Sequence, residues 1–235
     1  MRSIIEPINI FWLNLDLSSA TVLELSTTLS PRERQRVARY SSATDQRRAI
    51  VSLARRKKIL ADICDQLPED LIIRQNSSGK PFVNTGKGTT VEMSSSQSGS
   101  VGLFAVTRQR SIGVDVESLS EIPKSKRFAS WVATPSESRA INALEQSERT
   151  RAYLRLWTRK EAYFKATGEG IGSGITHIDV PVTSEPSGQP FRRTINGARW
   201  LFHAIPCPRA DLEATLAISV STDAESQLQI IVSQC

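Results

Sequence analysis

The 235-residue sequence has few cysteines and few histidines, which excludes several kinds of protein. Its three cysteines, Cys64, Cys207 and Cys235, are an odd number without motif spacing. They indicate reduced thiols rather than a disulfide framework. The two histidines, His177 and His203, lie far from any cysteine cluster, so we do not expect a zinc site.

Long apolar runs are absent as well. No stretch approaches the roughly 18 apolar residues that a membrane-spanning helix needs. Residues 1–7 also lack the apolar core of a signal peptide. We therefore expect a cytoplasmic protein that does not act at a membrane.

Aromatic residues make up only 6% of a chain whose net charge is +6. The positive charge favours an anionic partner, which could be nucleic acid, a phosphorylated small molecule or an acidic protein. A basic surface that only maintains solubility is the plainer alternative. A nucleic-acid-binding module built on the basic residues 32–58 stays open, although no aromatic side chains alternate with the basic ones there, as stacking would require.

Hydrophobic and turn patterns predict an α+β fold in two halves that share a rhythm of strand, helices and strands. We expect an N-terminal lobe at residues 1–110 and a similar C-terminal lobe at 111–235. The expected strands are 8–15, 71–74, 101–106, 112–116, 175–182, 198–205, 214–220 and a final edge strand at 228–232. The expected helices are 20–29, 32–40, 45–66, 124–132, 135–146 and 149–166, with turns at 76–81, 84–88 and 184–190.

Two acidic residues lie on one of these strands. Asp115 and Glu117 are two residues apart, so both side chains point to one face, while Val114 and Val116 point to the other. Two neighbouring carboxylates repel unless one is protonated or a cation lies between them. Magnesium prefers such oxygen ligands and often binds substrate phosphates as well. An ordinary strand with two surface acids is the plainer alternative.

A helix about forty residues further on offers a third carboxylate. Glu161 and Lys165 are four residues apart on one helix face, which alone would be an ordinary surface ion pair. Beside the acidic strand, Glu161 could complete a metal site and Lys165 could contact a phosphate. Lys160 lies on a neighbouring face. Trp157 and Phe164 are expected to pack in the core, without a chemical role.

Three further basic residues are candidates for phosphate contacts. Lys80 lies in the constrained turn Gly79-Lys80-Pro81, which lacks the spacing of a Walker loop. Arg36 and Arg48 lie on the basic helices. For each of these side chains, a solvated charge is the plainer interpretation.

Taken in order, these motifs resemble a known family. The run Gly113-Val114-Asp115-Val116-Glu117, followed by Trp157-Thr158-Arg159-Lys160-Glu161-Ala162-Tyr163-Phe164-Lys165, is similar to the paired motifs of surfactin-synthetase-type (Sfp-type) 4′-phosphopantetheinyl transferases. The 79–81 turn and the basic region 30–48 match that family too, so the resemblance covers most of the chain.

The resemblance implies a fold, a reaction and a set of site residues. The fold would be two pseudo-symmetric lobes with coenzyme A bound between them in a monomer. The reaction would be magnesium-dependent transfer of phosphopantetheine to a serine of an apo acyl or peptidyl carrier protein, with adenosine 3′,5′-bisphosphate released. Asp115, Glu117 and Glu161 would bind Mg²⁺, with Asp115, Glu161 and Lys165 as catalytic residues. Coenzyme A would contact Arg36, Arg48, Lys80, Ser96, Gln97 and Lys165.

Two positions depart from the family pattern. Gln97 stands where the family usually has a phosphate-contacting histidine, and an amide cannot supply its charge. We therefore expect weaker coenzyme binding, and a degenerate transferase that binds coenzyme A without turnover stays open. Glu33 replaces a lysine of some members. The residues do not decide the carrier protein, or whether Glu161 or a metal-bound hydroxide takes the serine proton.

Overall fold

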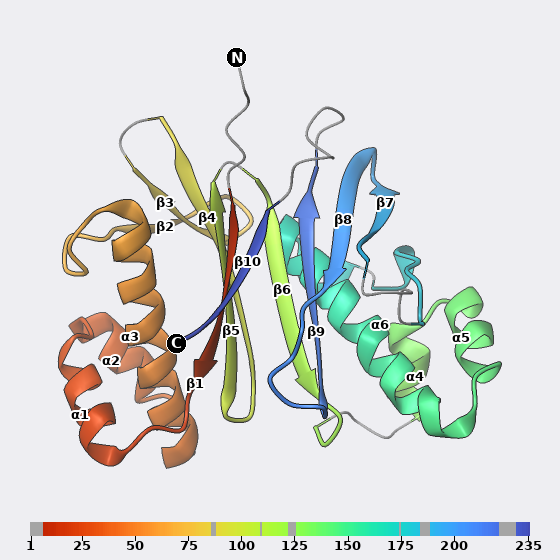
Figure 1. The fold of residues 1–235 in the computed structure, drawn as a ribbon, viewed down its shortest axis with the longest axis horizontal. Helices are drawn as coiled ribbons and strands as arrows, with labels where there is room; N and C mark the ends of the chain where they lie inside the picture. Colours follow the sequence, from red (N-terminus) through yellow and green to blue (C-terminus); the bar gives the residue numbers. More distant parts are fainter. Residues whose placement is uncertain are drawn as a thin grey trace.

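Two β-sheets lie side by side between two groups of helices in the computed structural model of this chain (Figure 1). The structure describes residues 7–85, 88–108, 110–121, 126–173, 175–183, 189–220 and 229–235. Its elements are β1 (Ile8–Asn14), α1 (Ser19–Thr27), α2 (Pro31–Val37), α3 (Ala43–Cys64), β2 (Ile73–Gln75), β3 (Pro81–Asn84), β4 (Thr90–Ser98), β5 (Val101–Arg108), β6 (Ile112–Ser118), α4 (Lys126–Val132), α5 (Pro135–Asn142), α6 (Gln146–Thr167), the short 3₁₀ helices η1 (Ile171–Ser173) and η2 (Ile175–His177), β7 (Phe191–Ile195), β8 (Ala198–Ala204), β9 (Leu212–Ser219) and β10 (Ile230–Gln234).

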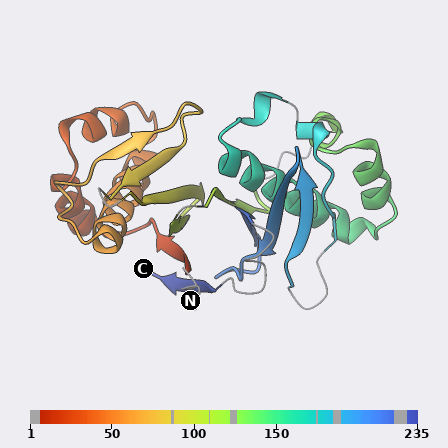
Figure 2. The ribbon, with the colours of Figure 1, turned by 90° about the horizontal axis from the view of Figure 1, so that it is seen from above.

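The described strands form a first sheet in the order β10-β1-β5-β4-β3-β2 and a second in the order β6-β9-β8-β7. One apolar core lies between the sheets and includes Ile10, Leu103, Val114 and Leu216. A second core joins the first sheet to α1 and α3, and a third joins the second sheet to α6. Seen from above, the helices therefore lie on the two outer sides (Figure 2).

Serines on β4 connect the two sheets. The hydroxyl of Ser94 accepts a hydrogen bond from the amide of Val114 at 3.0 Å, and that of Ser98 accepts from Ser118 at 3.1 Å. These side chains alternate along the strand, so they all face β6. The polar run at 94–98 is therefore part of strand β4, which is not among the strands predicted from the sequence.

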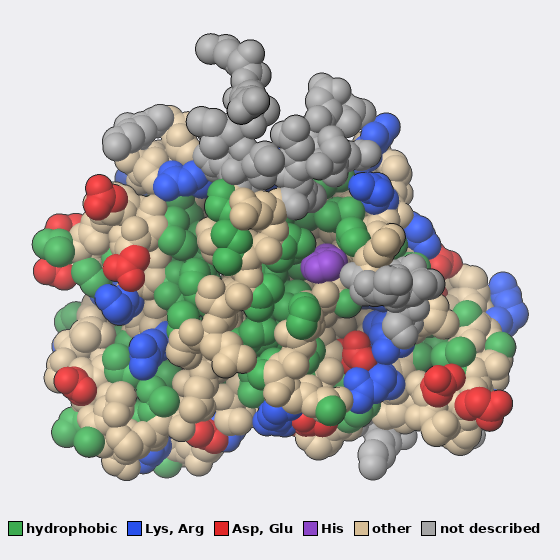
Figure 3. Space-filling view, in the orientation of Figure 1, with side chains coloured by type: hydrophobic (Ala, Val, Ile, Leu, Met, Phe, Trp, Pro, Cys, Tyr) green, Lys and Arg blue, Asp and Glu red, His purple; other side chains and the backbone are tan. Residues whose placement is uncertain are grey.

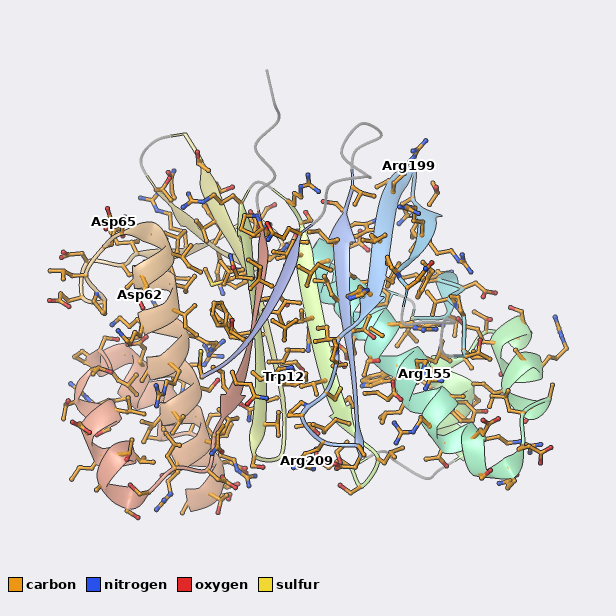
Figure 4. All side chains as sticks on the ribbon, viewed as in Figure 1. Trp12, Asp62, Asp65, Arg155, Arg199 and Arg209 are labelled. Atoms are coloured by element: carbon orange, nitrogen blue, oxygen red, sulfur yellow. The ribbon has the colours of Figure 1, made fainter. Side chains whose placement is uncertain are left out.

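The C-terminal strand connects the two ends of the chain. β10 runs parallel to β1, with Ile8 opposite Ile230, at the edge of the first sheet. The indole of Trp12, labelled near the middle of Figure 4, donates a hydrogen bond to the carbonyl of Pro206 in the other half. The division into lobes 1–110 and 111–235 stays a prediction, and β10 extends from the second range into the sheet of the first.

Most predicted helices are confirmed, because their ends carry strong signals. Ser30 and Glu33 form a reciprocal capping box at the start of α2, and Pro31 occupies its first turn. Helix α6 ends at Gly168, whose φ of 81° is left-handed. The mixed α+β class is confirmed as well. Residues 86–87 and 184–188 of two predicted turns lie outside the described ranges.

The strand predicted at 175–182 is wrong. This segment contains the 3₁₀ helix η2 and an extended stretch, and it buries Ile178, Val180 and Val182 against α6. The amide of Val180 donates to Glu137 instead of a strand partner, and Pro181 has no amide hydrogen to donate. The alternating apolar residues correctly indicated that one side of the segment is buried. An extended segment without a strand partner shows the same alternation, so the pattern alone does not predict a strand.

Strand β7 was not predicted from the sequence. It pairs with β8 through a tight turn at Asn196 and Gly197, with φ angles of 50° and 76°. Asn-Gly between two apolar runs is a strong hairpin signal, which could have located β7.

The surface shows where charge is concentrated. On the face in Figure 3, hydrophobic side chains gather over the two sheets, while many charged ones lie toward the helices on either side. Among the described helices, none is long and apolar enough to span a membrane.

Candidate active site

Helix α6 lies directly against strand β6, and a glycine makes this approach possible. A Cβ atom at Gly113 would stand 1.9 Å from the carbonyl oxygen of Ala162 and 2.5 Å from the amide nitrogen of Ala166. Any larger residue would therefore push the helix away. The close contact brings the helix face that carries Trp157, Glu161 and Lys165 onto the acidic strand.

Asp115 is the buried centre of this contact, with only 1% of its surface exposed. Its Oδ1 accepts hydrogen bonds from the ammonium of Lys165 at 2.6 Å and from the hydroxyl of Ser96 at 2.7 Å. Lys165 also donates to Ser96 at 3.0 Å, which closes a triangle of contacts. Asp115 is therefore not a surface acid, and the plainer alternative is wrong for this residue. Lys165 on α6 pairs with Asp115 on β6 instead of forming a surface ion pair within its own helix.

Two further carboxyl groups lie close enough to Asp115 to respond to its charge. Burial, reinforced by the negative charge of Asp115, raises the pKa of Glu117 to about 7. The same two causes raise the pKa of Glu161 to about 7, although Lys165 opposes them. Burial also raises the pKa of Asp115 itself, against the pull of Lys165 and Ser96. The site therefore holds more negative charge than its own cation neutralises.

This donor set suits a hard divalent cation chemically. Oδ2 of Asp115 is buried and has no hydrogen-bond partner among the described residues, so one carboxylate oxygen is left for a ligand. A cation would also relieve the repulsion that raises the pKa values of Glu117 and Glu161. Within the described parts of the chain, however, no three His, Cys, Asp or Glu side chains already stand as a group that could hold a metal ion. The magnesium site stays a prediction.

A cavity of about 300 Å³ opens beside these residues. Glu161 and Lys165 line it from α6, and Lys80 lines it from the turn before β3. The ammonium of Lys80 donates to the carbonyl of Ala166 at 2.9 Å and lies 3.4 Å from a carboxylate oxygen of Glu92. Burial lowers the pKa of Lys80. Lys80 thus binds the end of α6 while it borders the cavity, and its phosphate contact stays a prediction.

A larger pocket of about 820 Å³ lies under helices α2 and α3. It shares lining residues with the first cavity, namely Pro81, Met93 and Ser95. Its basic lining residues are Arg32, Arg36, Arg39, Arg56 and Lys57. The two cavities are therefore neighbours, and the larger one is lined by five basic side chains and by one acidic side chain, Glu33, among its described lining residues.

Arg56 is the residue of this pocket that sequence reasoning missed. Its guanidinium donates to the hydroxyl of Ser95 at 2.6 Å and to the carbonyl of Ser52 at 3.0 Å, both of which are neutral. Burial, and next the like charge of Arg36, lower the pKa of Arg56 to about 10. Two arginines are thus held near each other beside an open pocket, which favours an anion there.

The other predicted coenzyme contacts lie in different places. Arg48 binds Asp16 through two hydrogen bonds of 2.7 and 2.9 Å instead of lining the pocket with Arg36. Ser96 lies at the acidic cluster, where it bridges Asp115 and Lys165. Gln97 is exposed on the neighbouring position of β4. The coenzyme roles of these three residues stay predictions.

A buried ion pair fixes a neighbouring face of α6. Lys160 is fully buried, and its ammonium lies 2.6 Å from Oε2 of Glu137 and 2.8 Å from the carbonyl of Val132. Glu137 also accepts from the amides of Thr134 and Val180. Since Lys160 precedes Glu161, this contact helps to set the rotation of the helix. Its sequence signal was the capping box of α5, Thr134 followed three residues later by Glu137.

Comparison with known proteins gives matches over the same region. A family model described as the 4′-phosphopantetheinyl transferase superfamily matches residues 111–219. The protein slr0495 of Synechocystis sp. is 31% identical over 64% of this chain and 61% of its own length. The 4′-phosphopantetheinyl transferase HetI of Nostoc sp. is 28% identical over 77% of each chain. A holo-[acyl-carrier-protein] synthase of Oenococcus oeni is 36% identical over 40% of this chain and 73% of its own. The chain thus spans about three fifths of the first of these relatives.

Proposed function

Because this chain belongs to the 4′-phosphopantetheinyl transferase superfamily, we propose that it is an enzyme that modifies carrier proteins. It transfers the 4′-phosphopantetheine group of coenzyme A to a serine of an apo acyl or peptidyl carrier protein and releases adenosine 3′,5′-bisphosphate. Magnesium is its metal. Relatives named as 4′-phosphopantetheinyl transferase and holo-[acyl-carrier-protein] synthase support this proposal.

The observation that carries the proposal is the cluster around Asp115. A buried carboxylate with an orphaned oxygen, two further carboxyl groups and one ammonium stand beside a cavity. Carboxylates and a lysine arranged around a divalent metal are a common way to bind a pyrophosphate. Asp115, Glu117 and Glu161 would hold the magnesium, which, when bound, would withdraw charge from the pyrophosphate.

The positive pocket supplies a place for the nucleotide end of coenzyme A. Arg36 and Arg56 would contact a phosphate there, and the shared lining at Met93 and Ser95 places this pocket next to the cavity that Glu161 and Lys165 line. The basic side chains surround a hollow rather than a flat face, so a small anion fits them better than a nucleic-acid duplex. Gln97 would make the coenzyme contact weaker than a histidine would.

The chain's own residues then account for the transfer step. The carrier serine Oγ attacks the phosphorus that bears the pantetheine arm, and the bond from that phosphorus to the bridging oxygen breaks. The electron pair leaves with adenosine 3′,5′-bisphosphate. Glu161 lines the cavity beside the cluster, and we assign its carboxylate as the group that accepts the serine proton. Lys165 places its positive charge beside the reacting phosphate and stabilises the charge that develops there.

Within the superfamily, we assign the chain to the Sfp type. The order of the basic region, the Gly79-Lys80-Pro81 turn, the acidic strand and the α6 motif supports this assignment. Two sheets, each with its own helices, support two pseudo-symmetric lobes in a monomer, with coenzyme A between them. The net charge of +6 would steer an acidic carrier protein to the site.

Mass spectrometry of carrier proteins tests the proposal. Apo carriers of fatty acid, polyketide and nonribosomal peptide synthesis are each incubated with the chain, coenzyme A and Mg²⁺. We expect at least one carrier to gain the mass of one phosphopantetheine group on its serine. No gain on any carrier, from a folded chain, would refute the proposed transfer.

A further inference from the structure

An indole N–H is aimed at one of the proposed metal ligands. Nε1 of Trp157 on α6 donates a hydrogen bond to Oε1 of Glu117 on β6 at 3.1 Å. The sequence had assigned Trp157 to core packing only. The indole N–H can donate a hydrogen bond but cannot accept one, so Trp157 is the donor and the carboxylate oxygen of Glu117 is the acceptor.

Trp157 belongs to the same helix stripe as the catalytic candidates. Trp157, Glu161 and Lys165 follow one another at intervals of four residues and therefore face β6 together. Trp157 reaches Glu117, and Lys165, two turns later, reaches Asp115. Each acid of the strand is thus held by a donor from the same helix face.

A second tryptophan covers the first. The ring of Trp131 on α4 packs against that of Trp157 with centroids 5.6 Å apart and an interplanar angle of 40°. Trp131 is itself 48% exposed, so it lies on the solvent side of the pair. Trp131 therefore contacts the Trp157 ring, whereas the hydrogen bond to Glu117 comes from Trp157.

Among the residues that the structure describes, Trp157 is the one whose side chain donates a hydrogen bond to Glu117. Asp115 has two donors on one oxygen, whereas the bond from Trp157 is the side-chain hydrogen bond that acts on Glu117. An unrestrained glutamate has three rotatable side-chain bonds, and each must be fixed when it binds a metal ion. A donor on one oxygen leaves the other oxygen directed at the ligand.

We infer that Trp157 is a positioning residue, which fixes the Glu117 carboxylate for Mg²⁺ and so sets the metal affinity of the site. This inference rests on the proposed function, since it takes Glu117 as a metal ligand. Trp157 is not among the residues that line either of the two cavities described above. It acts through one hydrogen bond to one carboxylate oxygen.

The first test is a double-mutant cycle on magnesium affinity, measured by calorimetry with the chain saturated with coenzyme A. Trp157→Phe keeps an aromatic ring and removes the donor, so we expect Mg²⁺ binding to weaken about tenfold, as for a hydrogen bond to a charged group. In a Glu117→Gln background, the same change should weaken it less than twofold. Unchanged affinity in the first case, or an equal loss in both, would overturn the inference.

Trp131→Phe is the matched control. It alters the neighbouring indole of the same pair, which does not bond to Glu117, and should leave Mg²⁺ affinity within twofold of the wild type. The transfer rate of Trp157→Phe should also recover at saturating Mg²⁺. A purely structural role would leave the rate low at any metal concentration, and that result would contradict the inference.

A second measurement does not depend on a folded Trp157 variant. Nitrogen-15 spectra of the intact chain with coenzyme A show one indole signal for each of its four tryptophans, assigned through Phe variants of the other three. Titration with Mg²⁺ should shift the Trp157 signal and leave that of Trp12, which bonds to Pro206, unchanged. A stationary Trp157 signal while calorimetry shows metal binding would overturn the inference.

These readouts separate the two proposals. If no carrier protein is modified, the proposed transfer fails, while metal binding and the indole signal still decide the role of Trp157. If carriers are modified but the Trp157→Phe variant binds Mg²⁺ like the wild type, only the positioning role fails.

Discussion

The ammonium of Lys165 lies 2.6 Å from Oδ1 of the buried Asp115. This pair joins the last turns of α6 to the middle of β6 and leaves the second oxygen, Oδ2, without a partner among the described residues. A buried carboxylate with one oxygen neutralised and one oxygen unsatisfied is costly for stability. Such an arrangement is typical of a site that binds a cation.

Gly113→Ala should destabilise the fold strongly. The added methyl group would collide with the backbone of Ala162 and Ala166, which cannot move without displacing α6. We expect a loss of about 2 kcal/mol or more in the free energy of unfolding, measured with urea. Gly172→Ala is the matched control, because nothing lies within 4 Å of a Cβ atom there. Equal stability of the two variants would show that the helix is not held in this contact.

Lys160→Met should also destabilise the chain, for an electrostatic reason. It leaves Glu137 buried without its cation, at a cost of about 3–5 kcal/mol. The control is Lys58→Met, which breaks an exposed pair with Asp62 and should cost less than about 1 kcal/mol. Addition of Glu137→Gln to Lys160→Met should restore part of the loss. A Lys160→Met variant as stable as its control would contradict the buried-pair account.

Glu161→Gln should change how stability depends on pH in metal-free buffer. The pKa of Glu161 is about 7 in the folded chain against an ordinary 4.5, so the folded state retains a proton that the unfolded state has released. Stability therefore falls as pH rises through this window. A neutral glutamine avoids the cost, so the variant should gain stability over the wild type at pH 8, and that gain should shrink at pH 5.

Urea unfolding at both pH values measures this difference. The exposed Glu24→Gln on α1 controls for the loss of one negative charge at the surface. A gain for Glu161→Gln that is the same at pH 5 and pH 8 would show that Glu161 is not strained by burial and by Asp115.

Arg56→Met should weaken coenzyme A binding by at least tenfold, because a hydrogen bond to a charged group contributes about 1.5–3 kcal/mol. Calorimetry at two salt concentrations measures this effect, and the loss should be smaller at high salt. Arg209→Met, which removes an exposed arginine paired with Asp211, is the control. Equal affinity of the Arg56 and Arg209 variants would place the coenzyme outside the positive pocket.

Much of this architecture follows from local patterns. Capping residues at Ser30 and Gly168 mark helix ends, and the valines of β6, which alternate with its acids, lie in the core between the sheets. These signals are local, because a cap or a strand face depends on residues a few positions apart. These local signals predicted the α+β class, whereas the expectation that Glu161 and Lys165 lie beside Asp115 came from the family resemblance.

Contacts between distant segments were beyond such patterns. The bond from Trp157 to Glu117 joins residues forty positions apart, and that from Arg56 to Ser95 joins residues 39 apart. In neither pair does the sequence spacing indicate that the two residues are in contact. The strand that carries the serines of β4 was not predicted, because their bonding partners lie on β6, in the other sheet.

The most direct test of the account is the mass of an apo carrier protein after incubation with this chain, coenzyme A and Mg²⁺. The wild type should add one phosphopantetheine group to the serine of at least one carrier. Asp115→Ala should abolish the addition while the fold persists, whereas Asp211→Ala, at an exposed ion pair, should leave it intact. Modification by Asp115→Ala at the wild-type rate, or none by the folded wild type on any carrier, would contradict the account.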